Sequence, residues 1–365
     1  MSNFFKNKSV AITGACGSVG SELVKKLALQ HHEVAEIKAV DNNESELFFL
    51  EQKYLSDKRV KVSLTDVSDK ETLGKIFEGV DVVFHCAALK HVVMCERSPE
   101  IAINTNIYGV RNVISACELN HVRTLIFTSS DKAVNPTNVM GTSKLMGERL
   151  ITAANSSVRK RDSIFASTRF GNVLGSNGSV LPIFYSQILS GQPVTITDTE
   201  MTRFIMSIDQ AVELVLNSAV MAKGGEVFVT KMPVVRIVDL AEALVAELFD
   251  RSLIKNKSIR INLIGKKPGE KLYEELMNDE EMRRSVELKE YFSVLPAFRG
   301  MHHETRYCYE DVVSNSVRDP YHSGRQTVLS IDEIRQYFRD NYIIEKLTVN
   351  ASNRYWPGDK EVNER

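Results

Sequence analysis

Short apolar runs recur through the first half of the chain, and polar segments of loop or helix length separate them. The runs are SVAIT (9–13), EIKAV (36–40), RVKVSL (59–64), DVVFHC (81–86), TLIFTS (124–129) and SIFASTRFGN (163–172). Their β-branched residues, and their alternation with helix-length segments, predict parallel strands joined by crossover helices. Because the runs are almost continuously apolar, we expect a sheet that is covered on both faces.

One intervening segment, TNIYGVRNVISACELN (105–120), carries its apolar residues at helical spacing. The residues that fall on one side are Ile107, Val110, Val113, Ile114 and Cys117. This period differs from the alternation of a half-buried strand and predicts a helix packed on the sheet. The first 172 residues therefore predict an α/β fold with a Rossmann-like, doubly wound parallel sheet.

The pattern becomes irregular beyond residue 172. Loops rich in Gly, Pro and Asn separate shorter elements there: NVLGSNGSVLP (172–182), SGQPVTITD (190–198) and IGKKPGEK (264–271). Such loops suit a smaller C-terminal α/β lobe that binds a substrate. We predict an NAD-binding Rossmann domain over 1–172 to which 205–230 returns, a substrate lobe over 173–204 and 231–345, and a C-terminal tail over 346–365.

Composition and charge narrow the class of protein. Of the 365 residues, 43% are hydrophobic and 25% are charged, as in globular proteins. No apolar run approaches the roughly 18 to 20 residues that cross a membrane, and the N-terminus lacks a signal-peptide pattern. The five cysteines include no CxxC pair, which suits reduced thiols and a cytoplasmic protein. A net charge of -1 predicts neither a nucleic-acid partner nor an acidic membrane surface.

A glycine-rich loop, GACGSVG (14–20), joins the first predicted strand to the helix SELVKKLALQ (21–30). Strand, glycine turn and helix occur in the order that a dinucleotide site requires. Gly14 permits the tight turn, Gly17 lets a pyrophosphate approach the backbone, and the helix N-terminus offers N–H groups. The GxxGxxG spacing also fits a turn that merely connects two elements. Cofactor contacts are predicted for Gly14, Cys16, Gly17, Ser18, Val19 and Gly20.

A carboxylate at the end of the second strand strengthens the cofactor prediction. Asp41 lies about 20 residues beyond the loop, where an aspartate accepts both ribose hydroxyls of an adenosine, and Asn42 follows it. No Lys or Arg lies between Asp41 and Lys53 to receive a 2′-phosphate, so we predict NAD rather than NADP. Asp66 and Val67 are expected beside the adenine, although an aspartate after a strand is also an ordinary cap.

Seven motifs together resemble one family. They are TGACGSVG (13–20), HCAALKHV (85–92), NTNIYGVRNV (104–113), SSDKAVNPTNVMGTSK (129–144), RFGNVLGSNGSVLPIF (169–184), MTRFIMS (201–207) and KPGEKLYEEL (267–276). The chain is similar to extended short-chain dehydrogenase/reductases, and more narrowly to nucleotide-sugar 4,6-dehydratases of bacterial polysaccharide and nonulosonic-acid pathways. The resemblance implies UDP-N-acetylglucosamine as the substrate or, as in some relatives, a GDP-linked sugar. It also implies a homo-oligomer, because two helices beside the active site commonly pair between subunits in this family.

Met140 stands where such folds usually have a catalytic tyrosine, and a thioether has no proton to give. The resemblance places the chain in a branch with the pattern MxxxK, in which Met140 would pack against sugar or nicotinamide. It implies oxidation of C4 of the sugar by NAD, loss of water across C5 and C6, and return of hydride to C6. Lys144, one helical turn after Met140, would grip the nicotinamide ribose.

Loss of water requires an acid and a base side by side. The resemblance assigns Asp131 to the C6 hydroxyl and Lys132 to the C5 proton, and Ser130 would pass on the O4 proton. Lys132 is a base only if its pKa is lowered, and Lys90, Lys144 and the oxidised nicotinamide are the expected sources of that change. The alternative for Asp131 and Lys132 is a solvated turn pair.

Further positions are expected to contact cofactor or substrate. They are Ala87 and Ala88 beside the cofactor, Asn106 near the active-site lysine, Lys90 and His91 at the sugar or its phosphates, and Asn172, Val180, Arg203 and Glu270 at the nucleotide diphosphate, base and ribose. Arg203 suits a phosphate because guanidinium binds oxyanions in a fork, but a salt bridge is its alternative. Glu270 also fits an ion pair, and Asn106 also fits a helix cap or bend. The spacing of His85, Cys86, His91 and Cys95 fits no common zinc pattern, so we predict no metal.

Two other functions fit parts of this pattern. A nucleotide-sugar C4 epimerase or reductase on the same fold needs oxidation or reduction at C4 but no acid/base pair for C5 and C6. A non-catalytic protein that binds NAD would explain the missing tyrosine. The SSDK segment (129–132) argues against the epimerase or reductase, and the non-catalytic protein stays as an alternative.

Overall fold

The computed structural model describes residues 4–157, 163–176, 178–258, 260–266, 269–298 and 305–351. Its main sheet consists of β1 (Ser9–Thr13), β2 (Glu36–Asp41), β3 (Val60–Leu64), β4 (Val82–His85), β5 (Thr124–Ser130), β6 (Ile164–Phe170), β10 (Val227–Thr230), β14 (Ser285–Leu288), β15 (Tyr291–Val294) and β16 (Val312–Ser314). The strand order is β16-β14-β15-β10-β6-β5-β4-β1-β2-β3. Every neighbouring pair from β3 to β10 is parallel. Each of the six predicted runs therefore forms a strand of one doubly wound sheet.

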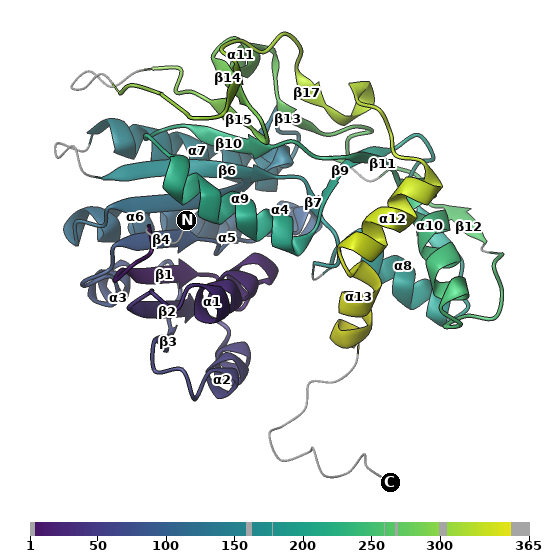
Figure 1. Cartoon of the computed structure of the whole chain (residues 1–365), viewed down its shortest axis with the longest axis horizontal. Coiled ribbons are helices and arrows are strands. Elements are labelled where there is room, and N and C mark those ends of the chain that lie inside the picture. Colours follow the sequence, from purple (N-terminus) through teal and green to yellow (C-terminus); the bar gives the residue numbers. More distant parts are fainter. Residues whose placement is uncertain are drawn as a thin grey trace.

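Helices cover both faces of this sheet. They are α1 (Ser18–Gln30), α2 (Glu44–Lys53), α3 (Lys70–Ile76), α6 (Gly109–Leu119), α7 (Val139–Ser157) and α9 (Ile208–Met221). α1 and α9 pack together on one face, and α3, α6 and α7 pack on the other (Figure 1). The predicted apolar side of α6 is buried at Val110, Val113, Ile114 and Cys117, in one cluster with Phe127 of β5.

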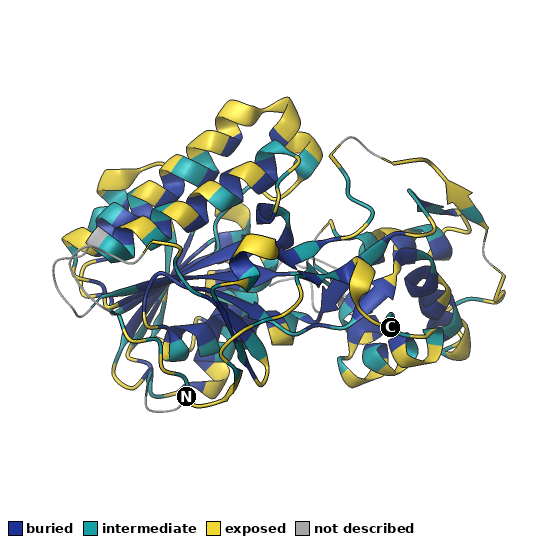
Figure 2. Ribbon diagram, turned by 90° about the horizontal axis from the view of Figure 1, so that it is seen from above, coloured by how far each residue is buried: buried dark blue, intermediate teal, exposed yellow. Residues whose placement is uncertain are grey.

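A smaller lobe lies beside the carboxyl edge of the sheet (Figures 1 and 2). Its helices are α8 (Val180–Leu189), α10 (Ile237–Asp250), α12 (Ile331–Asp340) and α13 (Ile343–Ala351). Its strands are β7 (Asn172–Val173), β8 (Val194–Ile196), β9 (Thr202–Met206), β11 (Val234–Arg236) and β12 (Ile261–Leu263). These helices bury Phe184, Leu240, Leu244 and Phe338 in a core of their own.

Short elements complete the chain between these two parts. They are α4 (Val92–Arg97), α5 (Pro99–Ile103), β13 (Glu275–Met277), α11 (Asp279–Met282) and β17 (Tyr321–His322), with a π-helical turn over Asn104–Tyr108 and 3-10 turns over Asp131–Ala133 and Ser323–Arg325. β13 and β17 pair antiparallel, so the segment near residue 275 is bound to a segment nearly fifty residues later. This pairing brings the C-terminal part of the chain to the carboxyl edge of the sheet.

Two predicted boundaries need correction. Residues 285–314, assigned to the substrate lobe, provide β14, β15 and β16, which extend the main sheet beyond β10 in antiparallel register. The start predicted for the tail, residue 346, is wrong, because residues up to Ala351 belong to α13 and Leu347 is buried in the core of the lobe. Residues 352–365 lie outside the described part of the chain.

A buried ion triad joins the sheet, helix α7 and the C-terminal extension. Arg169 of β6 donates from Nε and Nη2 to Glu148 of α7, at 2.8 and 2.7 Å. The same guanidinium donates from Nη1 and Nη2 to Glu281 of α11, both at 2.7 Å. All three side chains are at most 4% exposed. Because α7 also carries Met140 and Lys144, the triad fixes the helix that lines the candidate site.

Substitution Arg169→Met is expected to lower the free energy of unfolding by about 3–5 kcal/mol, because it removes the guanidinium to which both buried carboxylates are hydrogen-bonded. The matched control is Arg236→Met, since Arg236 is half exposed and pairs with Asp239 on one helix end. That control is expected to cost under about 1 kcal/mol. Denaturant unfolding of both variants measures the difference, and equal losses would contradict a structural role for the triad.

Candidate functional site

A cavity of ≈ 840 Å³ lies between the carboxyl ends of the parallel strands and the lobe. The ends of β1, β4, β5 and β6 meet at this edge, which is where open α/β sheets bind ligands. Predicted residues that line it are Gly14, Gly17, Ser18, Val19, Gly20, Ala88, Lys90, His91, Ser130, Asp131, Lys132, Met140, Lys144, Asn172, Val180, Arg203 and Glu270. Predicted residues outside the lining are Cys16, Asp41, Asn42, Asp66, Val67, Ala87 and Asn106.

The glycine loop has the geometry of a phosphate-binding turn. Gly14 has a φ of 70°, and a Cβ there would lie 2.6 Å from the backbone N of Ala87. A Cβ on Gly20 would lie 2.1 Å from the carbonyl oxygen of Gly14. Helix α1 starts directly after Gly17, and this glycine at the N-cap has no side chain to cap the first turn. The loop therefore approaches the end of β4 closely and leaves the helix N-terminus for an anion.

Three predicted adenosine contacts converge at the ends of β2 and β3. The Asp41 carboxylate accepts from the backbone N–H of Cys16 at 2.9 Å and of Asn43 at 3.0 Å. The Asn42 amide donates to Asp66 at 2.8 Å. Asp41 thus joins the end of β2 to the glycine loop. The residues of the loop and of these strand ends fit a dinucleotide.

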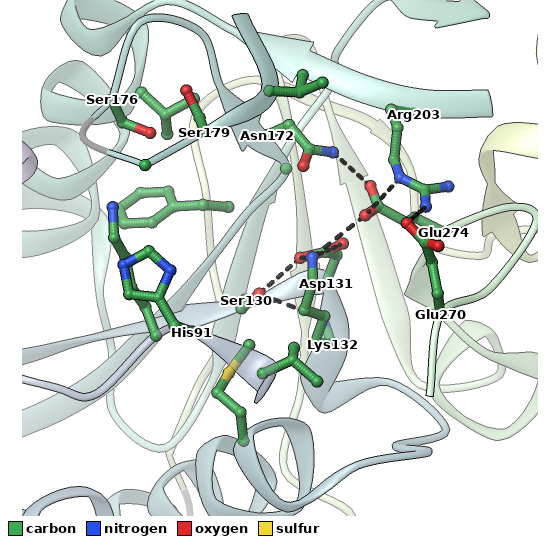
Figure 3. A pocket seen from close by; sticks show the side chains of 18 of the residues that line it. His91, Ser130, Asp131, Lys132, Asn172, Ser176, Ser179, Arg203, Glu270 and Glu274 are labelled. Atoms are coloured by element: carbon green, nitrogen blue, oxygen red, sulfur yellow. Dashed lines mark hydrogen bonds and ion pairs between the residues drawn. The ribbon is translucent and has the colours of Figure 1, made fainter. Parts of the chain in front are cut away.

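Ser130, Asp131 and Lys132 form the polar centre of the cavity (Figure 3). Ser130 ends β5, and its hydroxyl donates to Oδ1 of Asp131 at 2.5 Å. The Lys132 ammonium donates to Oδ2 of Asp131 at 3.1 Å and to Oε1 of Glu274 at 3.2 Å. The two carboxyl side chains are almost fully buried, whereas the Lys132 side chain is 33% exposed to the cavity. The cluster is therefore a dry carboxyl pair with one ammonium that faces the ligand space.

The charged groups in this cluster change one another's pKa values. Burial opposes the ammonium of Lys132, but Asp131 and Glu274 outweigh that effect and raise its pKa. Burial and the neighbouring Asp131 raise the pKa of Glu274 to about 7, against the opposing influence of Lys132 and Arg203. Burial also opposes the charge of Asp131, yet Lys132 and the hydrogen bonds of Asp131 lower its pKa. Asp131 is thus the anion and Glu274 is the carboxyl that holds a proton most readily near neutral pH.

The expected lowering of the Lys132 pKa is wrong for this state of the protein. The cation that opposes the ammonium is Arg203, and the two carboxylates outweigh it. Lys144, proposed as one source of the change, is itself shifted: burial lowers its pKa to about 8. Its Nζ donates to the carbonyl of Thr128 at 2.8 Å and lies 4.7 Å from the centre of the Phe127 ring. Lys144 therefore reaches the end of β5 from helix α7.

Arg203 and Asn172 contact protein groups where a diphosphate contact was expected. Arg203 lies 3.2 Å from Oε1 of Glu274 through Nε, and its Nη atoms donate to the backbone carbonyls of Thr202 and Lys271 at 2.8 and 3.0 Å. Asn172 donates from Nδ2 to Oε2 of Glu274 at 2.6 Å. Glu270 lies 3.9 Å from Arg203, so its ion-pair alternative is the arrangement observed. Arg203 and Asn172 thus organise Glu274.

The remaining predicted residues frame the cavity. Met140 is 3% exposed and packs in a small apolar cluster with Cys95 and Ala102, while one side of it lines the cavity. The His91 ring lies against the loop at Gly178, where a Cβ would be 2.6 Å from the ring. Val180 begins helix α8 on the opposite wall.

Asn106 does not reach the cavity, which corrects its assignment to the cofactor. It is 1% exposed, binds the backbone N and O of Leu89 at 2.8 and 2.9 Å, and donates to the Ser143 hydroxyl at 2.9 Å. Asn106 therefore fixes the loop after β4 to helix α7, one residue before Lys144. The hydrogen-bonding groups of its side chain are paired with protein groups, and Asn106 stabilises the site without lining the cavity.

Glu274 was missed by the sequence reasoning, although it lies in the quoted motif KLYEEL. Nothing in the local spacing separates it from Glu270 or Glu275. Its backbone N–H donates to the hydroxyl of Ser323 at 2.9 Å, and its carbonyl accepts from the Ser323 N–H at 2.8 Å. The contact with Ser323 spans 49 residues, so only long-range pairing locates Glu274 beside Lys132.

Metal-ligand clusters and membrane-spanning helices are both absent from the described residues. In the described ranges, no three His, Cys, Asp or Glu side chains gather as metal ligands would. His85 is fully buried and shares a 2.6 Å hydrogen bond with Thr13. No helix in the part of the chain that the structure describes has the length and apolarity needed to cross a bilayer.

The chain matches known proteins over most of its length. A family described as "Polysaccharide biosynthesis protein" matches residues 10–296. A Methanocaldococcus jannaschii protein named as an uncharacterized membrane protein is 48% identical over 296 residues, covering 81% of this chain and 88% of that protein. A UDP-N-acetylglucosamine 4,6-dehydratase (inverting) of Campylobacter jejuni is 36% identical over 304 residues, covering 83% and 87%. A UDP-glucose 4-epimerase of Rickettsia canadensis is 36% identical over 346 residues, covering 94% and 99%.

The fold is also found in solved structures. The X-ray structure of Pen from Bacillus thuringiensis is 35% identical and matches with a TM-score of 0.85, over 93% of this chain and 99% of that chain. The predicted α/β, Rossmann-like fold and the resemblance to extended short-chain dehydrogenases that act on nucleotide sugars are confirmed.

Carbon-13 NMR of the protein labelled at glutamate carboxyls is expected to show one side chain that titrates near pH 7, well above an ordinary glutamate. Glu274→Gln should remove that signal. Asp131→Asn should move it to lower pH, because Asp131 raises the pKa of Glu274. A spectrum in which every glutamate titrates below pH 6 would contradict the electrostatics described above.

Proposed function

The chain belongs to the polysaccharide biosynthesis protein family, and we propose from this premise that it is an NAD-dependent nucleotide-sugar 4,6-dehydratase of the cytoplasm. The proposed substrate is UDP-N-acetylglucosamine, and the proposed product is a UDP-linked 4-keto-6-deoxy sugar for a surface glycan or a nonulosonic acid. The similarity to the Campylobacter jejuni dehydratase supports this choice of reaction and substrate.

One observation carries the proposal: an acid/base cluster of Asp131, Lys132 and Glu274 lies at the cavity, beside a hydroxyl. Oxidation or reduction at C4 alone needs one group that transfers a proton, and this cluster has more than one such group. Removal of water across C5 and C6 needs an acid for the leaving hydroxyl and a base for the C5 proton. Because C5 and C6 are adjacent carbons, the acid and the base must lie close together. The cluster has both kinds of group within 3.3 Å of each other.

The proposed cofactor fits the glycine loop and Lys144, which line the cavity, and Asp41, which lies outside the lining. The loop from Gly14 to Gly20 would hold the pyrophosphate, Asp41 the adenosine ribose and Lys144 the nicotinamide ribose. When bound, NAD supplies the hydride chemistry, accepting hydride from C4 and returning it to C6. An aspartate at position 41 opposes a 2′-phosphate through like charge, which favours NAD over NADP.

The side chains then handle the protons. Ser130 accepts the O4 proton and passes its own to Asp131, whose Oδ1 lies 2.5 Å away. Asp131 gives that proton to the C6 hydroxyl, which leaves as water. Lys132 removes the C5 proton and later returns one. Met140 contributes a dry, apolar wall, and a proton route through Ser130 and Asp131 replaces the tyrosine that the fold usually carries.

A C4 epimerase is the second candidate, because a relative of that name is 36% identical over nearly its whole length. An epimerase also oxidises C4 and returns hydride to the same carbon. Its product has the mass of the substrate, so the two functions are separated by mass alone.

Incubation of the protein and NAD with UDP-N-acetylglucosamine is expected to give a product lighter by one water. Lys132→Ala should slow this loss of water by roughly 10²–10⁴-fold, the usual contribution of a general acid or base. The matched control is Lys231→Ala, since Lys231 is also about one-third exposed and pairs with a carboxylate, Glu287, outside the cavity. Mass spectrometry provides the measurement, and a product of unchanged mass would favour the epimerase.

A further inference from the structure

Glu274 is the one carboxyl of the central cluster that the proton steps above leave without a role. It is 5% exposed and still lies at the cavity wall. Its Oε1 is 3.2 Å from Nζ of Lys132 and 3.2 Å from Nε of Arg203. Its Oε2 accepts from Asn172 at 2.6 Å. Three donors from three segments of the chain thus hold one buried carboxyl in place (Figure 3).

The proposed reaction requires Lys132 as an amine, but the carboxyl groups of Asp131 and Glu274, 3.1 and 3.2 Å from its Nζ, favour the ammonium. An ammonium cannot take the C5 proton. The proton that must first leave Nζ needs an acceptor within hydrogen-bond distance, and the carboxyl groups of Asp131 and Glu274 are the two candidates among the described residues. Asp131 is already occupied by the O4 proton that reaches it through Ser130. Glu274 is therefore the acceptor left for the Nζ proton.

We propose that Glu274 is the proton store of Lys132: its carboxylate takes one proton from the Nζ ammonium, which leaves the amine that removes the C5 proton. This inference rests on the proposed dehydratase function. Glu274 acts through Lys132 and contacts no reacting atom in the proposed steps, so it is a positioning and proton-holding residue.

The proton count closes over one turnover. The cluster begins as Lys132 ammonium with Asp131 and Glu274 both as carboxylates. Asp131 gains the O4 proton, and Glu274 gains one proton from Lys132. The amine then takes the C5 proton while Asp131 gives its proton to the leaving C6 hydroxyl. After hydride returns to C6, Lys132 gives a proton back to C5, and Glu274 returns its stored proton to Lys132.

Burial drives the transfer between Lys132 and Glu274. One third of the Lys132 side chain is exposed, and that part faces the cavity in which the sugar would lie. A sugar that covers it removes the remaining water, and desolvation disfavours both charged forms. A neutral amine beside a neutral carboxylic acid then becomes more accessible than it is in the open site. The raised pKa of Glu274, about 7, agrees with a carboxyl that gains a proton at little cost.

The C-terminal part of the chain fixes the position of Glu274. Its backbone is held by Ser323, whose hydroxyl also shares a 2.9 Å hydrogen bond with Thr202. Arg203 follows Thr202 on β9 and contacts the Glu274 carboxylate directly. The carboxyl therefore keeps one geometry relative to Lys132, as a reversible proton transfer requires.

Glu274→Gln is the decisive variant, because glutamine has the same shape and still accepts hydrogen bonds but holds no titratable proton. We expect kcat for water loss to fall roughly 10²–10⁴-fold with little change in KM. Reduced nicotinamide should accumulate after substrate is added, since oxidation of C4 does not need the store. Glu274→Asp keeps a carboxyl and should recover part of the lost rate.

The pH profile separates proton storage from a merely structural role. The store must begin as a carboxylate, so kcat of the unmodified protein should fall as pH drops through about 7, where Glu274 is protonated. The residual kcat of Glu274→Gln should lack this fall. The matched control is Glu247→Gln, which alters another buried, arginine-paired carboxylate far from the cavity and should leave kcat unchanged.

Two failures are distinguishable. If the unmodified protein removes no water, the proposed function is wrong. If it removes water and folded Glu274→Gln does so at a similar rate with the same pH profile, only the proton store is wrong.

Discussion

The contact between the Lys132 ammonium and two buried carboxyl groups is the interaction on which the rest of the site depends. Asp131 follows directly from strand β5, but Glu274 comes from a segment 142 residues away. Burying two carboxyl groups together is unfavourable unless cations and donors surround them. Lys132, Arg203 and Asn172 supply that surrounding. The parallel sheet, the lobe and the paired strands β13 and β17 meet at this cluster, and each contributes a charged group to it.

This requirement explains the arrangement of the fold around the cavity. β5 presents Ser130 and Asp131 at the carboxyl edge of the sheet, and β9 of the lobe presents Arg203. The pairing of β13 with β17 holds Glu274 against both. The buried Arg169 triad then ties helix α7, with Met140 and Lys144, to the same C-terminal region. A site that moves several protons gains from such rigidity, because each transfer depends on distances of about 3 Å.

Features set by local sequence were predictable, and features set by distant contacts were not. The six strands, the buried side of α6 and the glycine turn at Gly14 follow from periods and turn chemistry within short segments. Asp131 and Lys132 could be located because they follow a recognisable strand. The chain gives no local signal for β14 to β16, which extend the sheet through the antiparallel, long-range pairing of β15 with β10. Glu274 has none either, since its position depends on Ser323 and Arg203.

Charge interactions account for the other differences. Arg203 and Asn172 were expected at a diphosphate because their donors suit oxyanions, and the structure gives those donors an oxyanion of the protein instead. Burial and Arg203 lower the pKa of Lys132, but Asp131 raises it more than any other neighbour, and Glu274 raises it further. The sequence prediction considered neither carboxylate as a cause of the shift, although Asp131 itself was identified.

Proton NMR of the product formed in heavy water tests the central claim, that Lys132 handles the C5 proton while hydride moves separately from C4 to C6. Lys132 exchanges its protons with solvent, so the account predicts deuterium at C5 and a C6 methyl group that carries none. Deuterium in the methyl group, or an undeuterated C5 in every product molecule, would contradict it.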